Sequence, residues 1–278
     1  MNILKSIVLG IVEGITEWIP ISSTAHIKIF NKLLQMDVTP EFFKVFEVVI
    51  QLGAIIALLI IFWNKIWPFG KTKKPLGKGI LQYVKKDKFI LWLKIAVACI
   101  PVIIYELFLD SIVHFINEAN EFIFIAAALI IVGVLFVVVE IIIKDKNPII
   151  TSTKDITFTS ALIIGLSQLV AAVFPGVSRS GATIIASLLM GISRSTATEF
   201  TFELAIPVML GASFMKMLKY GFAFTFGEIF MMLISCIFAF ITSLFIIRFV
   251  LNFIKKNNFV IFGIYRVLLG IIIFMFLV

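Results

Sequence analysis

Hydrophobic and polar positions alternate along this chain in long blocks, and the blocks predict its secondary structure. A transmembrane helix needs about 20 mainly apolar residues. Six blocks reach that length, at residues 42–63, 89–109, 122–143, 199–219, 227–247 and 259–278. Two further apolar segments, 1–35 and 156–192, are each interrupted by a proline and a polar cluster. The pattern therefore predicts six full spans and two re-entrant helix-loop-helix segments.

Composition assigns the chain to the all-α integral membrane class. It has 278 residues, of which 61% are hydrophobic and only 14% are charged. A soluble domain cannot cover that much apolar surface, whereas a polytopic membrane protein exposes it to lipid. The lipid bilayer is therefore an expected partner of this chain.

The net charge of +8 is concentrated rather than spread along the chain. Eight lysines lie in the single segment 64–88, between the first two predicted spans. Positive charge gathered in one loop is typical of the cytoplasmic side of a membrane protein. We therefore expect a cytoplasmic loop there and no nucleic-acid partner.

The two broken segments resemble each other. Aligning GIVEGITEWIPISS with GLSQLVAAVFPGVS matches Gly10 to Gly165, Glu13 to Gln168, Pro20 to Pro175 and Ser23 to Ser178. A second pair of similar blocks, FEVVIQLGA and FELAIPVMLGA, follows in the same order. We predict a duplication within one integral membrane domain, with residues 1–150 as the first repeat and 151–278 as the second.

The number of spans determines how the two predicted repeats are oriented. A re-entrant segment adds no crossing, so each repeat crosses three times and the second is inverted relative to the first. Loop charges agree, because segment 110–121 carries acidic residues and no lysine or arginine, whereas 144–155 and 248–256 are basic. The exception is the turn at 216–221, whose two lysines would lie outside. Broken helices of inverted repeats meet near the midplane of the bilayer, where irregular backbone lines a cavity. We therefore expect the two polar clusters to form one site.

The first polar cluster, EGITEWIPISSTAH, combines two carboxylates with hydroxyls and a histidine. Glu13 and Glu17 are four residues apart and share one helical face, which suits a divalent cation or a general base. Ser23 and His26 are three apart on the next helix, where a histidine can assist a hydroxyl nucleophile. A plainer interpretation stays open, in which Ser22 and Ser23 cap a helix and His26 is a satisfied interior residue.

The second polar cluster, PGVSRSGAT, offers a turn of small residues that opens onto a helix. Backbone N–H groups at a helix start, together with Arg179, would bind a phosphate-like anion. Arg179 is one of only four arginines among 24 basic residues. The alternative is a loop whose arginine extends to the membrane interface. Carboxylates, hydroxyls and an arginine around one cavity indicate phosphoryl transfer from a lipid.

Other polar positions are less informative. Glu47, Gln51, Glu199 and Glu203 either support the site or make ordinary interhelical hydrogen bonds. His114 falls in the predicted outer loop, where we expect it to be solvated.

The two motifs together resemble the undecaprenyl-diphosphatase family, also called bacitracin-resistance proteins. The resemblance runs over nearly the whole chain, including FEVVIQLGAI and ATEFTFELAIP. It implies hydrolysis of undecaprenyl diphosphate, a polyprenyl diphosphate lipid, to the monophosphate, which recycles the carrier lipid for cell-wall synthesis. It also implies Mg²⁺ or Ca²⁺ as cofactor, multi-pass insertion in the bacterial plasma membrane, and an active site open to the outer side. Monomer and homodimer both stay open.

The family's motifs also imply roles for individual residues. Its acidic motif falls on Glu13 and Glu17, its serine–histidine motif on Ser22, Ser23 and His26, and its arginine loop on Ser178, Arg179 and Ser180. Ala25 stands where the family pattern leads us to expect a glycine. We expect catalytic roles for Glu17, Ser23, His26 and Arg179, and a metal held by Glu13 and Glu17. We expect substrate contacts from Ser22, Thr24, Gly176, Ser178, Arg179 and Ser180.

Two routes to hydrolysis follow from these roles. In one, Ser23 is activated by His26 and attacks the terminal phosphorus. In the other, His26 or Glu17 activates a water molecule.

The main alternative function is transport, because inverted repeats with broken helices are typical of secondary transporters. A polyprenyl-phosphate flippase would use the same lipid without hydrolysis. A phosphatase of the vanadium-haloperoxidase-like kind would need a further histidine beyond the arginine motif, and no histidine follows His114.

Overall fold

The computed structural model describes residues 1–71, 77–109 and 120–278. Outside these ranges lie His114, two of the eight lysines of segment 64–88, Lys73 and Lys74, and two acidic residues of segment 110–121, Asp110 and Glu118. Within the described ranges the chain forms helices and loops, with two isolated β-bridges in place of a sheet. The all-α integral membrane class is therefore confirmed.

Five long apolar segments are long enough to cross a membrane. They are α3 (Pro40–Val49) continued by α4 (Gln51–Ile66), α5 (Lys86–Ile104) continued by the π-helix η2 (Tyr105–Leu109), α6 (Glu121–Ile143), α9 (Arg194–Tyr220) and α10 (Phe226–Ile254). The sixth predicted span is α11 (Val260–Phe276), which has 17 residues and packs along α6. Short 3₁₀ turns, η1 (Gly79–Tyr83) and η3 (Thr153–Asp155), lie between spans.

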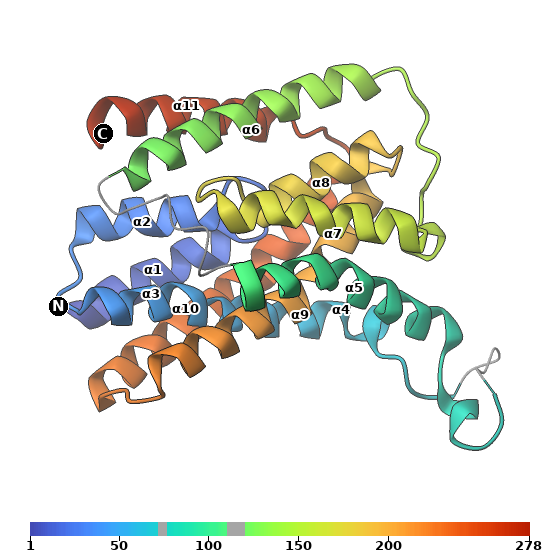
Figure 1. Cartoon of the computed structure of the whole chain (residues 1–278), viewed down its shortest axis with the longest axis horizontal. Coiled ribbons are helices and arrows are strands. Elements are labelled where there is room, and N and C mark those ends of the chain that lie inside the picture. Colours follow the sequence, from blue (N-terminus) through green and yellow to red (C-terminus); the bar gives the residue numbers. More distant parts are fainter. Residues whose placement is uncertain (72–76, 110–119) are drawn as a thin grey trace.

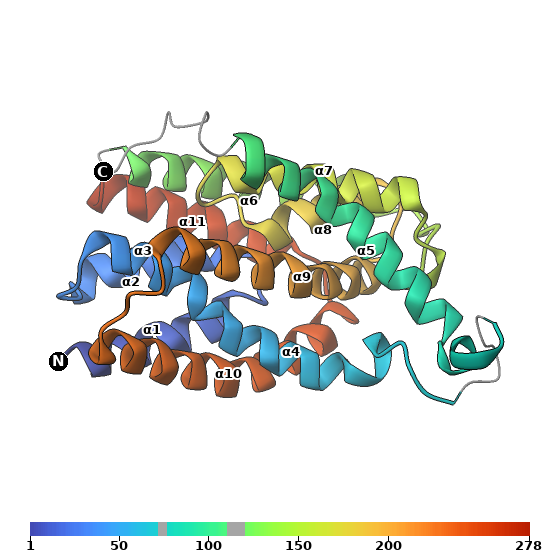
Figure 2. The same cartoon turned by 60° about the horizontal axis from the view of Figure 1, so that its bottom comes forward.

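The two broken segments form helical hairpins. The first consists of α1 (Asn2–Thr16) and α2 (Ser23–Leu34), and the second of α7 (Phe158–Val173) and α8 (Arg179–Leu189). At 1.5 Å per residue, each helix is too short to cross the roughly 30 Å hydrocarbon core. Figures 1 and 2 show that the hairpins enter from opposite ends of the molecule, so that their breaks face the middle.

Close helix contacts hold the hairpins among the spans. α1 packs on α10 and α7 packs on α5. Gly10 and Gly165 allow both contacts, because a Cβ on either would lie 2.4 Å from a backbone carbonyl oxygen of the facing helix. The sequence repeat relates α1 to α7, so the two glycines make equivalent contacts. The division into repeats at residue 150 stays a prediction.

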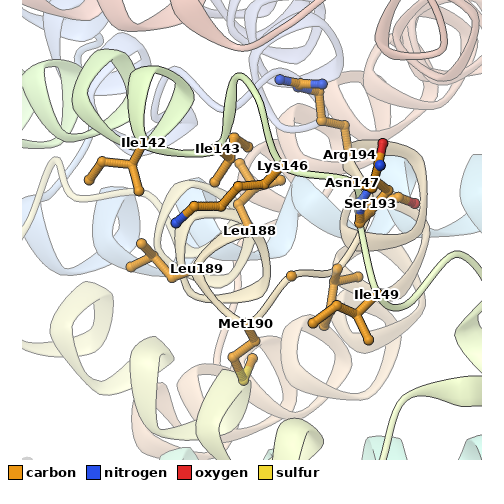
Figure 3. Close-up of a pocket in the computed structure, with 13 residues that line it drawn as sticks. Ile142, Ile143, Lys146, Asn147, Ile149, Leu188, Leu189, Met190, Ser193 and Arg194 are labelled. Atoms are coloured by element: carbon orange, nitrogen blue, oxygen red, sulfur yellow. The ribbon is translucent and has the colours of Figure 1, made fainter.

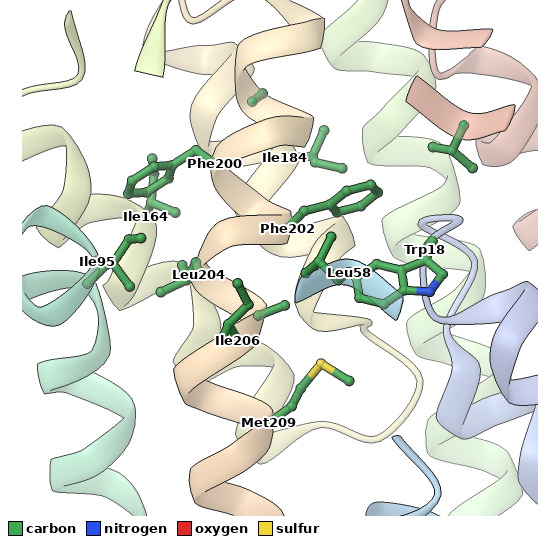
Figure 4. Close-up of a cluster of buried hydrophobic side chains, with 14 of the residues drawn as sticks. Trp18, Leu58, Ile95, Ile164, Ile184, Phe200, Phe202, Leu204, Ile206 and Met209 are labelled. Atoms are coloured by element: carbon green, nitrogen blue, oxygen red, sulfur yellow. The ribbon is translucent and has the colours of Figure 1, made fainter. Parts of the chain in front are cut away.

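An apolar core fixes the first break (Figure 4). Trp18, which follows Glu17 in the break, is 1% exposed and meets the Phe202 ring edge-on with centroids 5.1 Å apart. Its indole N–H donates to the Ser243 hydroxyl at 2.8 Å. Because a buried indole needs such an acceptor, Trp18 fixes the break to both α9 and α10.

Candidate active site

The site begins at the N-termini of α2 and α8, which the two breaks bring into the interior. Ser22 and Ser178 cap these helices, accepting the N–H of Ala25 at 3.4 Å and of Gly181 at 3.2 Å. Both serines have positive φ, 74° and 70°, which costs energy for a residue with a Cβ. Ser178 therefore corresponds structurally to Ser22, and the sequence alignment that paired it with Ser23 is wrong by one residue.

With that register, Ser23 and Arg179 occupy the first positions of equivalent helices. The carboxylate of Glu17 lies between them and contacts both. The Ser23 hydroxyl donates to Glu17 Oε2 at 2.7 Å, and Arg179 Nη2 donates to Glu17 Oε1 at 2.7 Å. Glu17 is 8% exposed and Ser23 is 9% exposed. Three of the four residues predicted to be catalytic thus form one continuous chain of contacts.

Arg179 is held inside the protein instead of extending to the membrane interface. Its Nη1 donates to the Thr201 carbonyl at 3.3 Å, and Nη2 lies 3.4 Å from the Met209 sulfur. These contacts fix the guanidinium between the end of α1 and the side of α9. The contacts favour an arginine held within the site over one that extends to the membrane interface.

A cavity of about 170 Å³ opens beside this chain of contacts. It is lined by Glu17, Ser22, Ser23, Thr24, Gln51, Ser178, Arg179, Ser180, Val208, Met209 and Ala212. The Ser178 and Ser180 hydroxyls lie 3.1 Å apart at its edge. Helix N-termini, hydroxyls and a guanidinium are the groups that bind phosphate oxygens.

A larger cavity of about 380 Å³ lies elsewhere, between the end of α6 and the end of α8 (Figure 3). Its lining includes Lys146, Leu188, Met190 and Arg194 but none of the predicted site residues. Arg194 forms a bidentate ion pair with Glu140, which also accepts the N–H of Phe259. That network joins α6, α9 and the start of α11. Its contacts therefore indicate a structural role in holding the three helices together.

His26 contacts groups other than the predicted one. Its Nδ1 lies 2.7 Å from the Ser22 carbonyl oxygen and its Nε2 lies 2.7 Å from the Tyr265 hydroxyl. Because a carbonyl only accepts, Nδ1 donates, and the Nε2 of a neutral imidazole accepts from Tyr265. The expected pairing of His26 with Ser23 is therefore absent, and Glu17 takes that place. Tyr265 was missed because an aromatic residue in an apolar helix looks like an ordinary lipid-facing side chain.

Gly176 also has a different position from the one expected. Its φ of +91° permits the turn, and a Cβ there would lie 2.9 Å from the Ile125 backbone. The residue does not line the cavity, and its carbonyl accepts a hydrogen bond from Arg266. Gly176 shapes the second break on the side away from the cavity, whereas Thr24 lines the cavity.

Glu13 and Glu17 could supply some of the oxygen ligands that a hard divalent cation needs. Glu13 is 1% exposed, and its Oε1 has no hydrogen-bond partner among the described residues. Glu17, the residue directly after α1, lies one helical turn further along the chain. The described residues contain no group of three or more acidic, histidine or cysteine side chains arranged around a metal. Because Mg²⁺ is commonly held by one or two carboxylates plus substrate phosphates, this pair fits a cation that the substrate completes.

Of the four weaker candidates, Gln51 reaches the cavity. Glu47 lies 3.6 Å from Lys28, and Glu199 lies 2.8 Å from Lys65. Glu203 is 1% exposed, and it borders a separate lysine-rich cavity.

Fold and site together define a polytopic helical membrane protein with a polar site enclosed between two opposed hairpins. Residues 6–272 match the family described as bacitracin resistance protein BacA. The chain belongs to that family.

Similar proteins carry a common name. An undecaprenyl-diphosphatase of Desulfitobacterium hafniense is 46% identical over 99% of this chain and 96% of its own length. One of Lachnoclostridium phytofermentans is 48% identical over 98% of this chain and 96% of its own. One of Enterococcus faecalis is 46% identical over 98% and 96%.

Proposed function

We propose that the chain is an undecaprenyl-diphosphatase, which hydrolyses undecaprenyl diphosphate to undecaprenyl phosphate and phosphate. The observation that carries the proposal is that Glu17 contacts both the Ser23 hydroxyl and the Arg179 guanidinium beside a polar cavity. The names of the similar proteins favour hydrolysis over lipid flipping or secondary transport. The reaction recycles the carrier lipid for peptidoglycan synthesis and so confers resistance to bacitracin.

Arg179 and the two helix N-termini bind the diphosphate. A guanidinium has five N–H donors, so the contacts to Glu17 and Thr201 leave donors for phosphate oxygens. The capped starts of α2 and α8 add partial positive charge. Ser22, Thr24, Ser178 and Ser180 supply further hydrogen bonds from the cavity wall. Phosphoryl transfer depends mainly on such positioning and charge neutralisation.

Ser23 is the nucleophile in the mechanism that the contacts favour. Glu17 Oε2 accepts the proton of the Ser23 hydroxyl as Oγ attacks the terminal phosphorus. The bond from that phosphorus to the bridging oxygen breaks, and undecaprenyl phosphate leaves with the electron pair. Water then attacks the phosphoserine, the proton returns to Oγ, and phosphate is released. His26 orients the start of α2 through the Ser22 carbonyl.

Direct attack by water is the second route, with Glu17 as the base. The two routes differ in whether phosphate becomes attached to the protein. Acid-quenched single turnovers with substrate labelled in the terminal phosphate distinguish them. Label on Ser23 by mass spectrometry supports the serine route, and unlabelled protein during rapid turnover supports water.

Glu13 and Glu17 would hold a divalent cation, Mg²⁺ or Ca²⁺. Such an ion supplies charge neutralisation for the diphosphate when bound. The unpartnered Oε1 of Glu13 supports this assignment, since a buried carboxylate oxygen without a donor is costly. Phosphate release measured with chelator, and after adding back each ion, tests the requirement.

The site faces the outer side of the bacterial plasma membrane. α2 leads from the cavity toward the end of the molecule where both termini lie, opposite the lysine-rich end (Figure 1). Labelling of Thr24→Cys and Lys71→Cys by an impermeant thiol reagent in cells tests this orientation. The reagent should modify Thr24→Cys in intact cells, because it reaches that thiol from outside, and it should modify Lys71→Cys only after the membrane is permeabilised. A homodimer is the proposed assembly, and light scattering of the detergent-solubilised protein measures it.

Activity of the purified chain tests the function itself. Phosphate release from undecaprenyl diphosphate in detergent is the expected result. Lipid movement across liposomes without phosphate release would overturn the proposal.

A further inference from the structure

The side chain of Arg266 is buried midway along α11 and touches both breaks at once. It has no exposed surface. Its Nη1 donates to the Pro20 carbonyl at 3.1 Å, and its Nη2 donates to the carbonyls of Gly176 at 2.8 Å and Val177 at 3.0 Å. None of these contacts is to a side chain, and Arg266 does not line the cavity.

Two of the three carbonyls that it binds, those of Pro20 and Gly176, occupy equivalent positions in the two hairpins. Since Ser22 corresponds to Ser178, Pro20 corresponds to Gly176 at the same spacing. Nη1 therefore binds the carbonyl of one hairpin and Nη2 binds the equivalent carbonyl of the other, together with that of Val177. A single side chain thus spans the boundary between the two halves of the site.

These carbonyls need a donor from outside their own helices. They lie in the non-helical breaks, and membrane interiors supply no water to unpaired backbone groups. The planar guanidinium fork can bind two groups at once, whereas a lysine is a point donor. Arg266 meets that requirement for both breaks and also sets the distance between them.

The helix that carries Arg266 is fixed by backbone contact. A Cβ on Gly263 would lie 2.6 Å from the Gly133 carbonyl oxygen of α6, and one on Gly133 would lie 2.7 Å from the Gly263 carbonyl oxygen. α6 and α11 therefore touch directly, one turn from Arg266. Because α11 is fixed against α6, the Arg266 guanidinium has a fixed position and can fix the position of both breaks.

We propose that Arg266 is a positioning residue that sets the two half-sites in register for catalysis. Through Pro20 it fixes the loop that leads to Ser23, and through Gly176 and Val177 it fixes the loop that leads to Arg179. The proposal rests on the assigned roles of Ser23 and Arg179 in hydrolysis.

Arg266→Lys, which keeps the charge and loses the fork, is the primary test. Because a misplacement of about 1 Å can cost about 100-fold in rate, we expect kcat to fall by about 30- to 100-fold. KM should change by less than about three-fold, since the groups that bind the diphosphate are retained. Thermal unfolding should confirm that the variant is folded. The matched control is Arg248→Lys, an exposed arginine on α10, and it should keep the wild-type kcat.

A double-mutant cycle distinguishes positioning from general destabilisation. If Arg266 acts through the geometry of Arg179, then Arg266→Lys should cost less than about five-fold in an Arg179→Ala background. The proposal would be overturned if the fold loss of kcat in the double variant equalled the product of the two single losses. A kcat of Arg266→Lys within about three-fold of wild type would overturn it as well. Wild-type hydrolysis in the same assay shows that such a failure concerns Arg266 and leaves the proposed function standing.

Gly263→Ala is the second variant if Arg266→Lys does not fold. It moves α11 away from α6 without altering the arginine. A lowered kcat with unchanged KM supports the proposal. An unchanged kcat in folded Gly263→Ala protein contradicts it.

Discussion

Glu17 and Arg179 lie 162 residues apart in sequence, and their side chains meet at 2.7 Å. Glu17 ends the first helix of one hairpin, and Arg179 begins the second helix of the other. Because the hairpins enter from opposite ends of the molecule, this contact requires both to reach the same depth. The ion pair therefore joins the two halves of the site, and Ser23 completes it from the side of Glu17.

Replacing Arg179 tests its part in binding the diphosphate. Removing one preorganised donor commonly costs about 10²–10³ in rate, so we expect a loss of this size for Arg179→Ala. Arg179→Lys should recover only part of it, because lysine cannot bind Glu17 and a phosphate in one plane. Arg248→Lys, at an exposed position on α10, is the control and should leave phosphate release unchanged.

The neighbouring serines should differ in how strongly their loss affects turnover, because Ser23 reacts whereas Ser22 caps α2 and only contacts the substrate. Ser23→Ala removes the proposed nucleophile, so the only phosphate release that remains should come from direct attack by water. Ser22→Ala removes the cap of α2 and should lower the free energy of unfolding by about 1 kcal/mol. It should also retain measurable turnover. A Ser23→Ala protein as active as wild type would remove the serine from the mechanism.

The contacts of His26 predict that it orients and that Glu17 acts as the base. Glu17→Gln should cost at least about 100-fold in kcat, the lower range for a general base. Tyr265→Phe removes one hydrogen bond to His26, worth about 1 kcal/mol, and should lower kcat by about five-fold. His26→Gln should fall between these two. If His26→Gln were as inactive as Glu17→Gln, the histidine would be a base in its own right.

Glu13→Gln tests the proposed cation site. Losing one of two carboxylates should raise the Mg²⁺ or Ca²⁺ concentration for half-maximal activity by about 10- to 100-fold. Activity at saturating ion should recover in part. Glu199→Gln, whose carboxylate pairs with Lys65 instead, is the matched control and should not shift the titration. Equal shifts for both variants would indicate a general effect of lost negative charge.

The sequence predicted the breaks, the opposed hairpins and most of the site because each has a local cause. Pro20 and Pro175 interrupt apolar segments. The polar residues beside them are costly in contact with lipid, so they face the protein interior or a cavity. The number of membrane crossings in each repeat then predicted that the two polar clusters, with Glu17 and Arg179, form one site.

Features that depend on side-chain direction could not be predicted in the same way. The spacing of Ser23 and His26 allows contact on a helix, but the N-terminal turn directs His26 toward the Ser22 carbonyl and Tyr265. The one-residue shift between Ser22 and Ser23 appears only in the cap geometry. Arg266 lies in α11, far from both motifs in sequence, and nothing in its apolar neighbours indicates that it binds their backbone.

The most direct test of a single hydrolytic site is phosphate release from undecaprenyl diphosphate by wild type, Glu17→Ala, Arg179→Ala and the double variant. We predict rapid release by the wild type and deep losses in both single variants. The double variant should be scarcely worse than either, because the two residues act as one unit. Full activity in either folded single variant would contradict the account.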